Sequence, residues 1–220
     1  MNIEMILSGF LFWFIIIILN LASGRFGYEI FSDLDSDAKL QKINDDPKKF
    51  RIGTVLALIE HFSIISLAVM LFVAFSPYNI ILAVVWTIFR IGEGLIQIYN
   101  KKDYWELLNI ARQYSGTNGA EKNALSDLGR SILKTKNSIF TFAQILFSIG
   151  TLAYSILFAT SKVIPDFIGW FGIVASILYG FGNGIRPVKP NFKVLWNVGG
   201  LLVWIFEIVL GGWLLFSPLI

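Results

Sequence analysis

Five ionisable side chains lie inside long apolar stretches of this sequence, where a charge is expensive. Arg90 and Glu93 occur in the segment WTIFRIGEGLIQIYN, residues 86–100, with glycines at positions 92 and 94. A charged group near the middle of a bilayer costs roughly 2.5–3.5 kcal/mol on insertion scales. Because a spacing of three residues puts both side chains on one face of a helix, we expect Arg90 and Glu93 to form an ion pair against protein or water rather than lipid.

Three further ionisable residues, Glu60, His61 and Glu207, come from two other apolar stretches. We predict that these residues meet Arg90 and Glu93 and line one polar cavity within the membrane. Three carboxylates against one arginine leave a negative excess, which a proton, a cation, a cationic ligand or a charged His61 must balance. The alternative is that the Arg90–Glu93 pair and protonated acids serve only to fix helix packing.

The amide side chains of Gln97 and Gln144 complete this set of candidate ligand-binding residues. Amides inside a membrane can contact a ligand or simply bridge two helices. Small residues allow helices to approach closely. We predict that four glycines lie at such helix contacts, namely Gly92, Gly94, Gly180 and Gly184.

The residue types in this sequence give little support to a catalytic site or a metal site. The chain has no cysteine and one histidine, so thiolate chemistry, disulfides and multi-histidine metal sites are excluded. The zinc motif HExxH and the nucleophile motif GxSxG are absent, and only Glu60 with His61 offers a group that could activate water. The five aspartates between residues 33 and 46 lack the glycine and the terminal glutamate of an EF-hand loop. We therefore predict no catalytic residue, no metal site and no cofactor.

Composition places the chain in a membrane. Of its 220 residues, 55% are hydrophobic and 15% are charged, whereas soluble domains contain about 45–50% apolar and about 25% charged residues. Six stretches are long enough, or nearly so, to cross a bilayer. They cover residues 5–23, 51–75, 80–100, 137–160, 168–185 and 194–216. The pI near 9.1 reflects basic loops beside apolar spans, so we do not expect a nucleic-acid partner.

The polar connections carry amphipathic patterns. The segment DSDAKLQKI predicts a short helix that Asp35, Ser36 or Asp37 could cap, with Pro47 just past its end. A second helix is predicted from Asp103 to Tyr114, and a third is predicted beyond the SGTNG break at residues 115–119. The predicted fold is therefore all-α: six transmembrane helices in one bundle forming a single domain, 1–220, plus two or three short amphipathic helices at the membrane interface.

Basic residues predict an orientation. All but two of the 18 lysines and arginines lie in the connections after the first, third and fifth spans. The positive-inside rule puts these connections in the cytoplasm and both termini outside, in the cell membrane.

Four segments together make the sequence resemble a bacterial and archaeal membrane family, domain of unknown function 4386. They are DDPKKFRIG from Asp45, FRIGEGLIQI from Phe89, SKVIPDFIGWFGIVASILYG from Ser161 and FEIVLGGWLLF from Phe206. The resemblance implies a small helical bundle without an assigned activity, and the family's span-three Arg and Glu and last-span Glu fall on Arg90, Glu93 and Glu207. Many family members carry basic residues before the first span and between the second and third. That pattern implies a cytoplasmic N-terminus, opposite to the orientation that this chain's own charges predict.

Three functions follow from these observations. The first is binding, sensing or transport of a small or lipidic ligand in the charged cavity. The second is a structural or accessory role, in which the chain packs with another membrane protein or with a second copy of itself. The third is an intramembrane enzyme that modifies a lipid. We favour the first.

Overall fold

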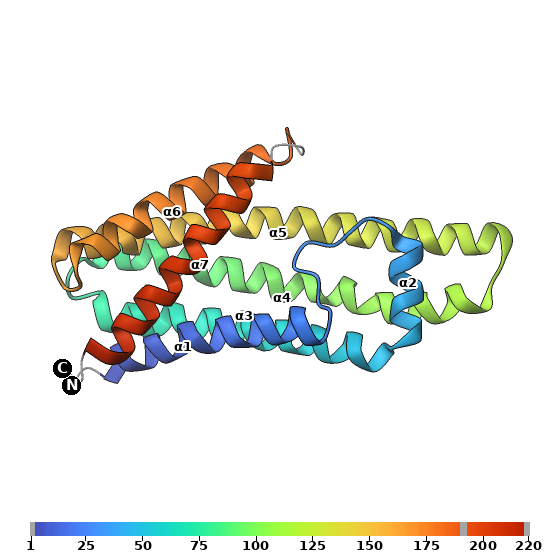
Figure 1. Cartoon of the computed structure of the whole chain (residues 1–220), viewed down its shortest axis with the longest axis horizontal. Coiled ribbons are helices and arrows are strands. Elements are labelled where there is room, and N and C mark those ends of the chain that lie inside the picture. The colour runs from blue at the N-terminus through green and yellow to red at the C-terminus, as the bar shows by residue number, and fades with distance from the viewer. Residues whose placement is uncertain (1–2, 190–192, 218–220) are drawn as a thin grey trace. The chain divides into compact units, whose positions relative to one another are not determined.

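The computed structural model describes residues 3–189 and 193–217, and every regular element in these ranges is helical (Figure 1). Helix α1 (Ile3–Asn20) continues into a π-helical turn at Leu21–Arg25, and a loop leads to the short helix α2 (Ser36–Asp45). The remaining helices are α3 (Pro47–Phe75), α4 (Ile80–Gly116), α5 (Gly119–Ser161), α6 (Asp166–Ile185) and α7 (Lys193–Phe216).

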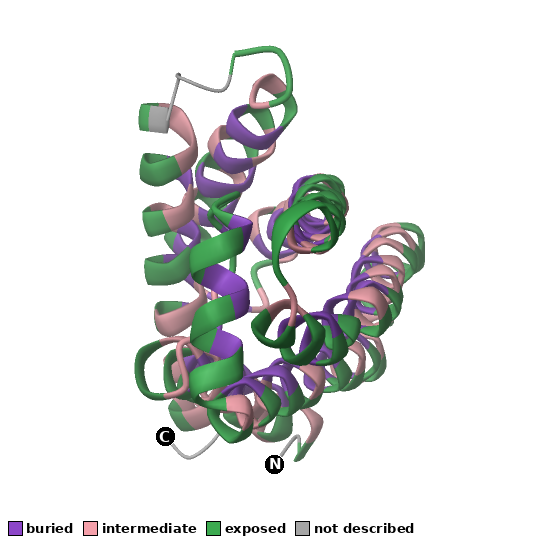
Figure 2. Ribbon diagram, turned by 90° about the vertical axis from the view of Figure 1, so that its right-hand side faces the viewer, coloured by how far each residue is buried: buried purple, intermediate pink, exposed green. Residues whose placement is uncertain are grey.

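Six of the helices are long and apolar enough to cross a membrane. They run over Ile3–Arg25, Pro47–Phe75, Ile80–Gly116, Gly119–Ser161, Asp166–Ile185 and Val194–Phe216. Each contains one of the predicted spans or nearly all of it, so the chain is a multi-pass membrane protein with an all-α fold, as predicted. The long helices bury residues on one side and expose them on the other, as Figure 2 shows.

The prediction of separate short helices between residues 101 and 136 is wrong. The 37-residue helix α4 continues from its apolar span to Gly116, and the 43-residue helix α5 begins at Gly119. Asp103 and Glu106 resemble a capping box, but no proline or glycine lies between residues 95 and 115, so the helix has no reason to end there. The break falls at the predicted SGTNG segment, where Gly119 has a φ of +61°. At 1.5 Å per residue, α4 and α5 are about 55 and 65 Å long, well beyond the roughly 30 Å hydrocarbon core.

Helix α2 forms as a separate element where the sequence predicts it. The Asp35 carboxylate accepts a hydrogen bond from the Ala38 amide at 3.1 Å, which identifies Asp35 as the N-cap among the three candidates. Asp46 then caps α3, accepting from the Lys49 amide at 2.9 Å, and Pro47 occupies the first turn of α3, where its missing N–H costs nothing. The interfacial position of α2 stays a prediction.

The chain divides into two compact units, and the helices α1, α3, α4 and α5 contribute residues to both. Unit 1 comprises residues 1–16, 62–95 and 141–220, and unit 2 comprises residues 17–61 and 96–140. Each unit has its own apolar core. Unit 1 is centred on large aromatic side chains such as Trp86, Tyr154 and Phe206, while unit 2 packs Tyr28, Leu40 and Tyr104 together. The single-domain assignment stays a prediction.

In unit 2, side chains from α5 fix the loop that precedes α2. The Asn137 amide accepts from the Ser32 N–H at 2.9 Å and donates to the Ser32 carbonyl at 2.8 Å. The Lys136 ammonium donates to the carbonyls of Glu29 and Ile30 at 2.7 and 2.9 Å. These bonds give hydrogen-bond partners to backbone groups of the irregular segment before α2.

In unit 1, glycines allow close packing of the C-terminal helices, and α6 and α7 lie side by side. A Cβ atom at Gly182 would lie 2.9 Å from the Trp196 backbone, and one at Gly199 would lie 2.7 Å from the Tyr179 backbone. Of the glycines predicted to pack, Gly180 lies directly against Ser148, whereas a Cβ at Gly184 would meet open space.

Candidate functional site

The ion pair predicted between Arg90 and Glu93 is present on α4 in unit 1. The Arg90 Nη1 atom donates to Glu93 Oε2 at 2.7 Å, and both side chains are about 95% buried. The guanidinium also lies over the Phe147 ring of α5, 4.4 Å from the ring centroid. A cation–π contact of this kind partly replaces the hydration that the arginine has lost.

Gly150 on α5 makes room for the arginine. A Cβ atom at this position would lie 2.9 Å from Arg90 Cγ and 3.4 Å from the Trp86 carbonyl oxygen. Sequence reasoning missed Phe147 and Gly150 because neither residue type signals a partner for a charge. The only available clue was a glycine in the interior of a long helix, where it is otherwise unfavourable.

A glutamine amide and a tyrosine hydroxyl extend the polar region of unit 1. The Tyr179 hydroxyl of α6 donates to Gln144 Oε1 of α5 at 3.0 Å, so the predicted candidate Gln144 bridges two helices. Glu207 of α7 is half-buried. The charges of Glu93 and Glu207 both act on the hydroxyls of Tyr154 and Tyr179, while Arg90 acts on Tyr154 and Arg186 acts on Tyr179.

We call these six residues the polar cluster of unit 1: Arg90, Glu93, Gln144, Tyr154, Tyr179 and Glu207. With both acids ionised, the cluster carries two negative charges and the positive charge of Arg90, and Arg186 at the end of α6 adds a second positive charge that acts on Tyr179. Electrostatic interactions are strong here because little water screens them.

The remaining predicted site residues lie in unit 2. The His61 Nδ1 atom is 2.6 Å from Glu60 Oε2, and both side chains are buried. His61 Nε2 is buried without a hydrogen-bond partner. Gln97 is also buried, and its backbone carbonyl accepts from the Lys101 ammonium at 3.4 Å. The predicted site residues thus fall in different units, with Glu60, His61 and Gln97 in unit 2 and Arg90, Glu93, Gln144 and Glu207 in unit 1.

Within residues 3–189 and 193–217, no group of three or more His, Asp or Glu side chains is placed to hold a metal ion. The side chains of the polar cluster offer charge recognition, hydrogen bonding and proton exchange.

Comparison with known proteins identifies the family. The family model described as "Domain of unknown function (DUF4386)" matches residues 7–217. The chain belongs to this family. No curated protein and no solved structure matches it. The DUF4386 description names no activity, so the function of this member must be argued from its own residues.

Proposed function

We propose that this DUF4386 protein binds, senses or transports a small or lipidic ligand through the charged residues inside its membrane spans, with the polar cluster of unit 1 as the recognition site. The gathering of ionisable side chains inside apolar spans carries the proposal. Arg90 forms a direct ion pair with Glu93. The Glu207 carboxylate acts on the same tyrosine hydroxyls as Glu93, and Arg186 acts on one of them. Ionisable groups are costly in an apolar setting and are by default a sign of a ligand, ion or proton site.

A structural role is the second candidate function, and a specific observation favours it. The Arg90–Glu93 pair satisfies itself within one helix, and Gln144 is already bonded to Tyr179. Groups that pair so completely can serve to fix helix register alone. In that case the chain would act by packing with another membrane protein or with a second copy of itself.

Native mass spectrometry of the full-length protein, released from mild detergent, separates the two functions. We expect wild-type protein to carry a discrete additional mass that is lost or strongly reduced in Glu207→Gln, because the amide removes the negative charge of this carboxylate while preserving its shape. Glu121→Gln is the matched control, since Glu121 is exposed in the first turn of α5. It should retain the additional mass.

Glu93→Gln adds a second comparison, because it breaks the ion pair as well as the charge balance. A wild-type spectrum without any bound mass, or one whose bound mass persists in both Glu207→Gln and Glu93→Gln, would favour the packing role.

A further inference from the structure

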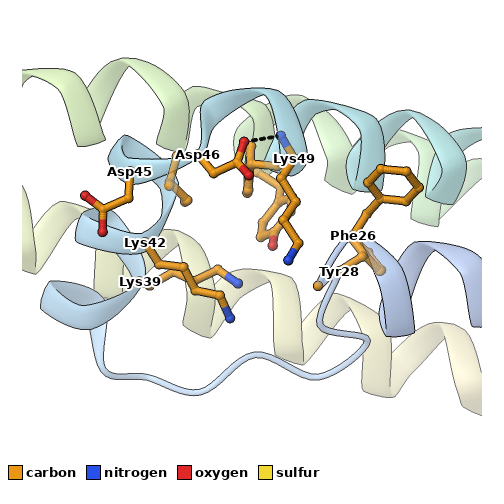
Figure 3. A pocket seen from close by; sticks show the side chains of 11 residues that line it. Phe26, Tyr28, Lys39, Lys42, Asp45, Asp46 and Lys49 are labelled. Atoms are coloured by element: carbon orange, nitrogen blue, oxygen red, sulfur yellow. Dashed lines mark hydrogen bonds between the residues drawn. The ribbon is translucent and has the colours of Figure 1, made fainter.

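Unit 2 contains a pocket that the intramembrane residues do not explain. It lies beside α2 and the start of α3 and has a volume of about 180 Å³ (Figure 3). Its walls comprise Phe26, Gly27, Tyr28, Lys39, Lys42, Ile43, Asp45, Asp46, Lys49, Phe50 and Tyr104. The volume of the pocket is several times the roughly 30 Å³ that one water molecule occupies in the liquid. It is below the roughly 300–1,000 Å³ of pockets that enclose whole drug-sized ligands, so the pocket suits a head group.

Three lysines from two helices bring their ammonium groups together at this pocket. Lys39 and Lys42 of α2 and Lys49 of α3 point toward one another across it (Figure 3). Within the part of the chain that the structure describes, neither Lys42 nor Lys49 forms an ion pair. Converging like charges repel one another, and an anion bound between them would relieve that repulsion.

Lys39 differs from the other two lysines because it is buried. Its ammonium lies 3.0 Å from Glu29 Oε1. Burial lowers the pKa of Lys39 from its ordinary value, and the Glu29 carboxylate opposes that shift. The pair therefore holds one ammonium group at a fixed place in the wall, with Glu29 compensating its burial.

The two acidic residues of the wall do not offset the lysines at the centre of the pocket. Asp46 uses its carboxylate as the N-cap of α3, accepting from the Lys49 amide. Asp45 points away from the three lysines (Figure 3). The Lys101 and Lys136 ammonium groups lie 5.4 and 5.3 Å from the centroid of the Tyr28 ring, which forms part of the wall.

The rest of the wall is apolar and aromatic. Phe26, Ile43 and Phe50 come from the loop, α2 and α3, and Tyr28 packs edge-on against Tyr104 with ring centroids 5.8 Å apart. A ligand for this pocket therefore needs an anionic group for the lysines and an adjoining apolar part for the aromatic wall. An anion of this size with several acceptor oxygens matches three ammonium donors best, and phosphate is the common biological group with those properties.

We propose that this pocket binds the phosphate group of a phosphate ester, with Lys39, Lys42 and Lys49 as its donors. The phosphate ester is either the head group of a membrane phospholipid or a free phosphorylated small molecule. The site uses none of the residues of the polar cluster of unit 1, so the proposal stands independently of the function proposed above.

Binding to purified full-length protein tests the site with two probes. Isothermal titration calorimetry measures binding of sn-glycerol 3-phosphate, and native mass spectrometry measures binding of phosphatidic acid against phosphatidylcholine. We expect saturable binding of at least one phosphate probe, weakened about tenfold or more in Lys42→Gln/Lys49→Gln, since two charge-assisted contacts are lost. Both lysines are exposed, so the variant should keep the wild-type melting temperature.

Lys48→Gln/Lys102→Gln is the matched control, because it removes the same charge from exposed positions of α3 and α4 outside the pocket wall. It should bind like wild type. Binding of phosphatidic acid without glycerol phosphate would identify a membrane lipid as the ligand, whereas binding of glycerol phosphate would identify a site for free phosphate esters. Three results would overturn the proposal: neither probe saturates, both double variants weaken binding equally, or Lys42→Gln/Lys49→Gln binds like wild type.

Discussion

Arg90→Met is expected to lower the free energy of unfolding by about 3–5 kcal/mol, the largest effect of any single substitution considered for this protein. The Glu93 carboxylate is about 96% buried and receives the Arg90 guanidinium at 2.7 Å. Methionine preserves much of the side-chain volume but leaves Glu93 without this partner. The carboxylate must then take up a proton or stay charged in a medium that solvates it poorly. The melting temperature of the purified protein in detergent measures the loss.

A double substitution shows whether the loss comes from the orphaned charge. Arg90→Met/Glu93→Met removes both partners, and we expect it to recover most of the stability, because replacing a whole buried pair by apolar groups is often nearly neutral. Arg112→Met is the control on the same helix. Arg112 is exposed, so the change should stay within about 0.5 kcal/mol. A double variant as unstable as Arg90→Met alone would contradict this explanation.

Gly169→Ala is expected to destabilise the protein by about 2 kcal/mol through a single added methyl group. A Cβ atom at Gly169 would collide with the Ala159 backbone of α5, lying 2.7 Å from its Cα. A backbone atom cannot rotate out of the way as a flexible side chain can, so α6 must shift away from α5. Overpacking of this kind typically costs 1–3 kcal/mol. Thermal unfolding in detergent, followed by tryptophan fluorescence, provides the measurement.

Gly184→Ala is the matched control on the same helix. Its Cβ would meet nothing within 4 Å, and alanine favours the helix over glycine by up to about 1 kcal/mol. We therefore expect unchanged or slightly higher stability. If both alanine variants unfolded at the wild-type temperature, the close approach of α5 and α6 at Gly169 would be incorrect.

The sequence was sufficient to predict the local features of this fold. Apolar stretches of adequate length predicted the six spans, and the i, i+3 spacing predicted the Arg90–Glu93 pair, because both depend on residues close in the chain. The N-cap of α2 was predictable for the same reason to within three residues, and the structure identifies Asp35. The boundaries of α4 and α5 were not, because a capping pattern does not end a helix that has no breaker before it.

The tertiary partners of these residues could not be predicted. Nothing in the sequence places Phe147 over Arg90 or Tyr179 against Gln144, since those contacts depend on how α4, α5 and α6 pack. The same holds for the packing glycines. Gly169 and Gly182 make close contacts that the small-residue spacing at Gly180 and Gly184 did not reveal. The lysine pocket of unit 2 was not predicted, because its lysines were interpreted only as basic residues of a cytoplasmic connection.

The accessibility of position 207 to water tests most directly whether the polar cluster of unit 1 is a ligand site or a sealed packing element. The chain contains no cysteine, so Glu207→Cys supplies a single thiol. Ile205→Cys, at an exposed apolar position of α7, and Leu210→Cys, at a fully buried one, are the controls. Protein in lipid vesicles is treated with a small, positively charged methanethiosulfonate reagent, and the added mass is measured. We expect labelling at position 207 and none at positions 205 and 210. If the thiol at position 207 stayed as unreactive as the two controls, no aqueous route to the cluster would exist, and binding of a small ligand from water at this cluster would be contradicted.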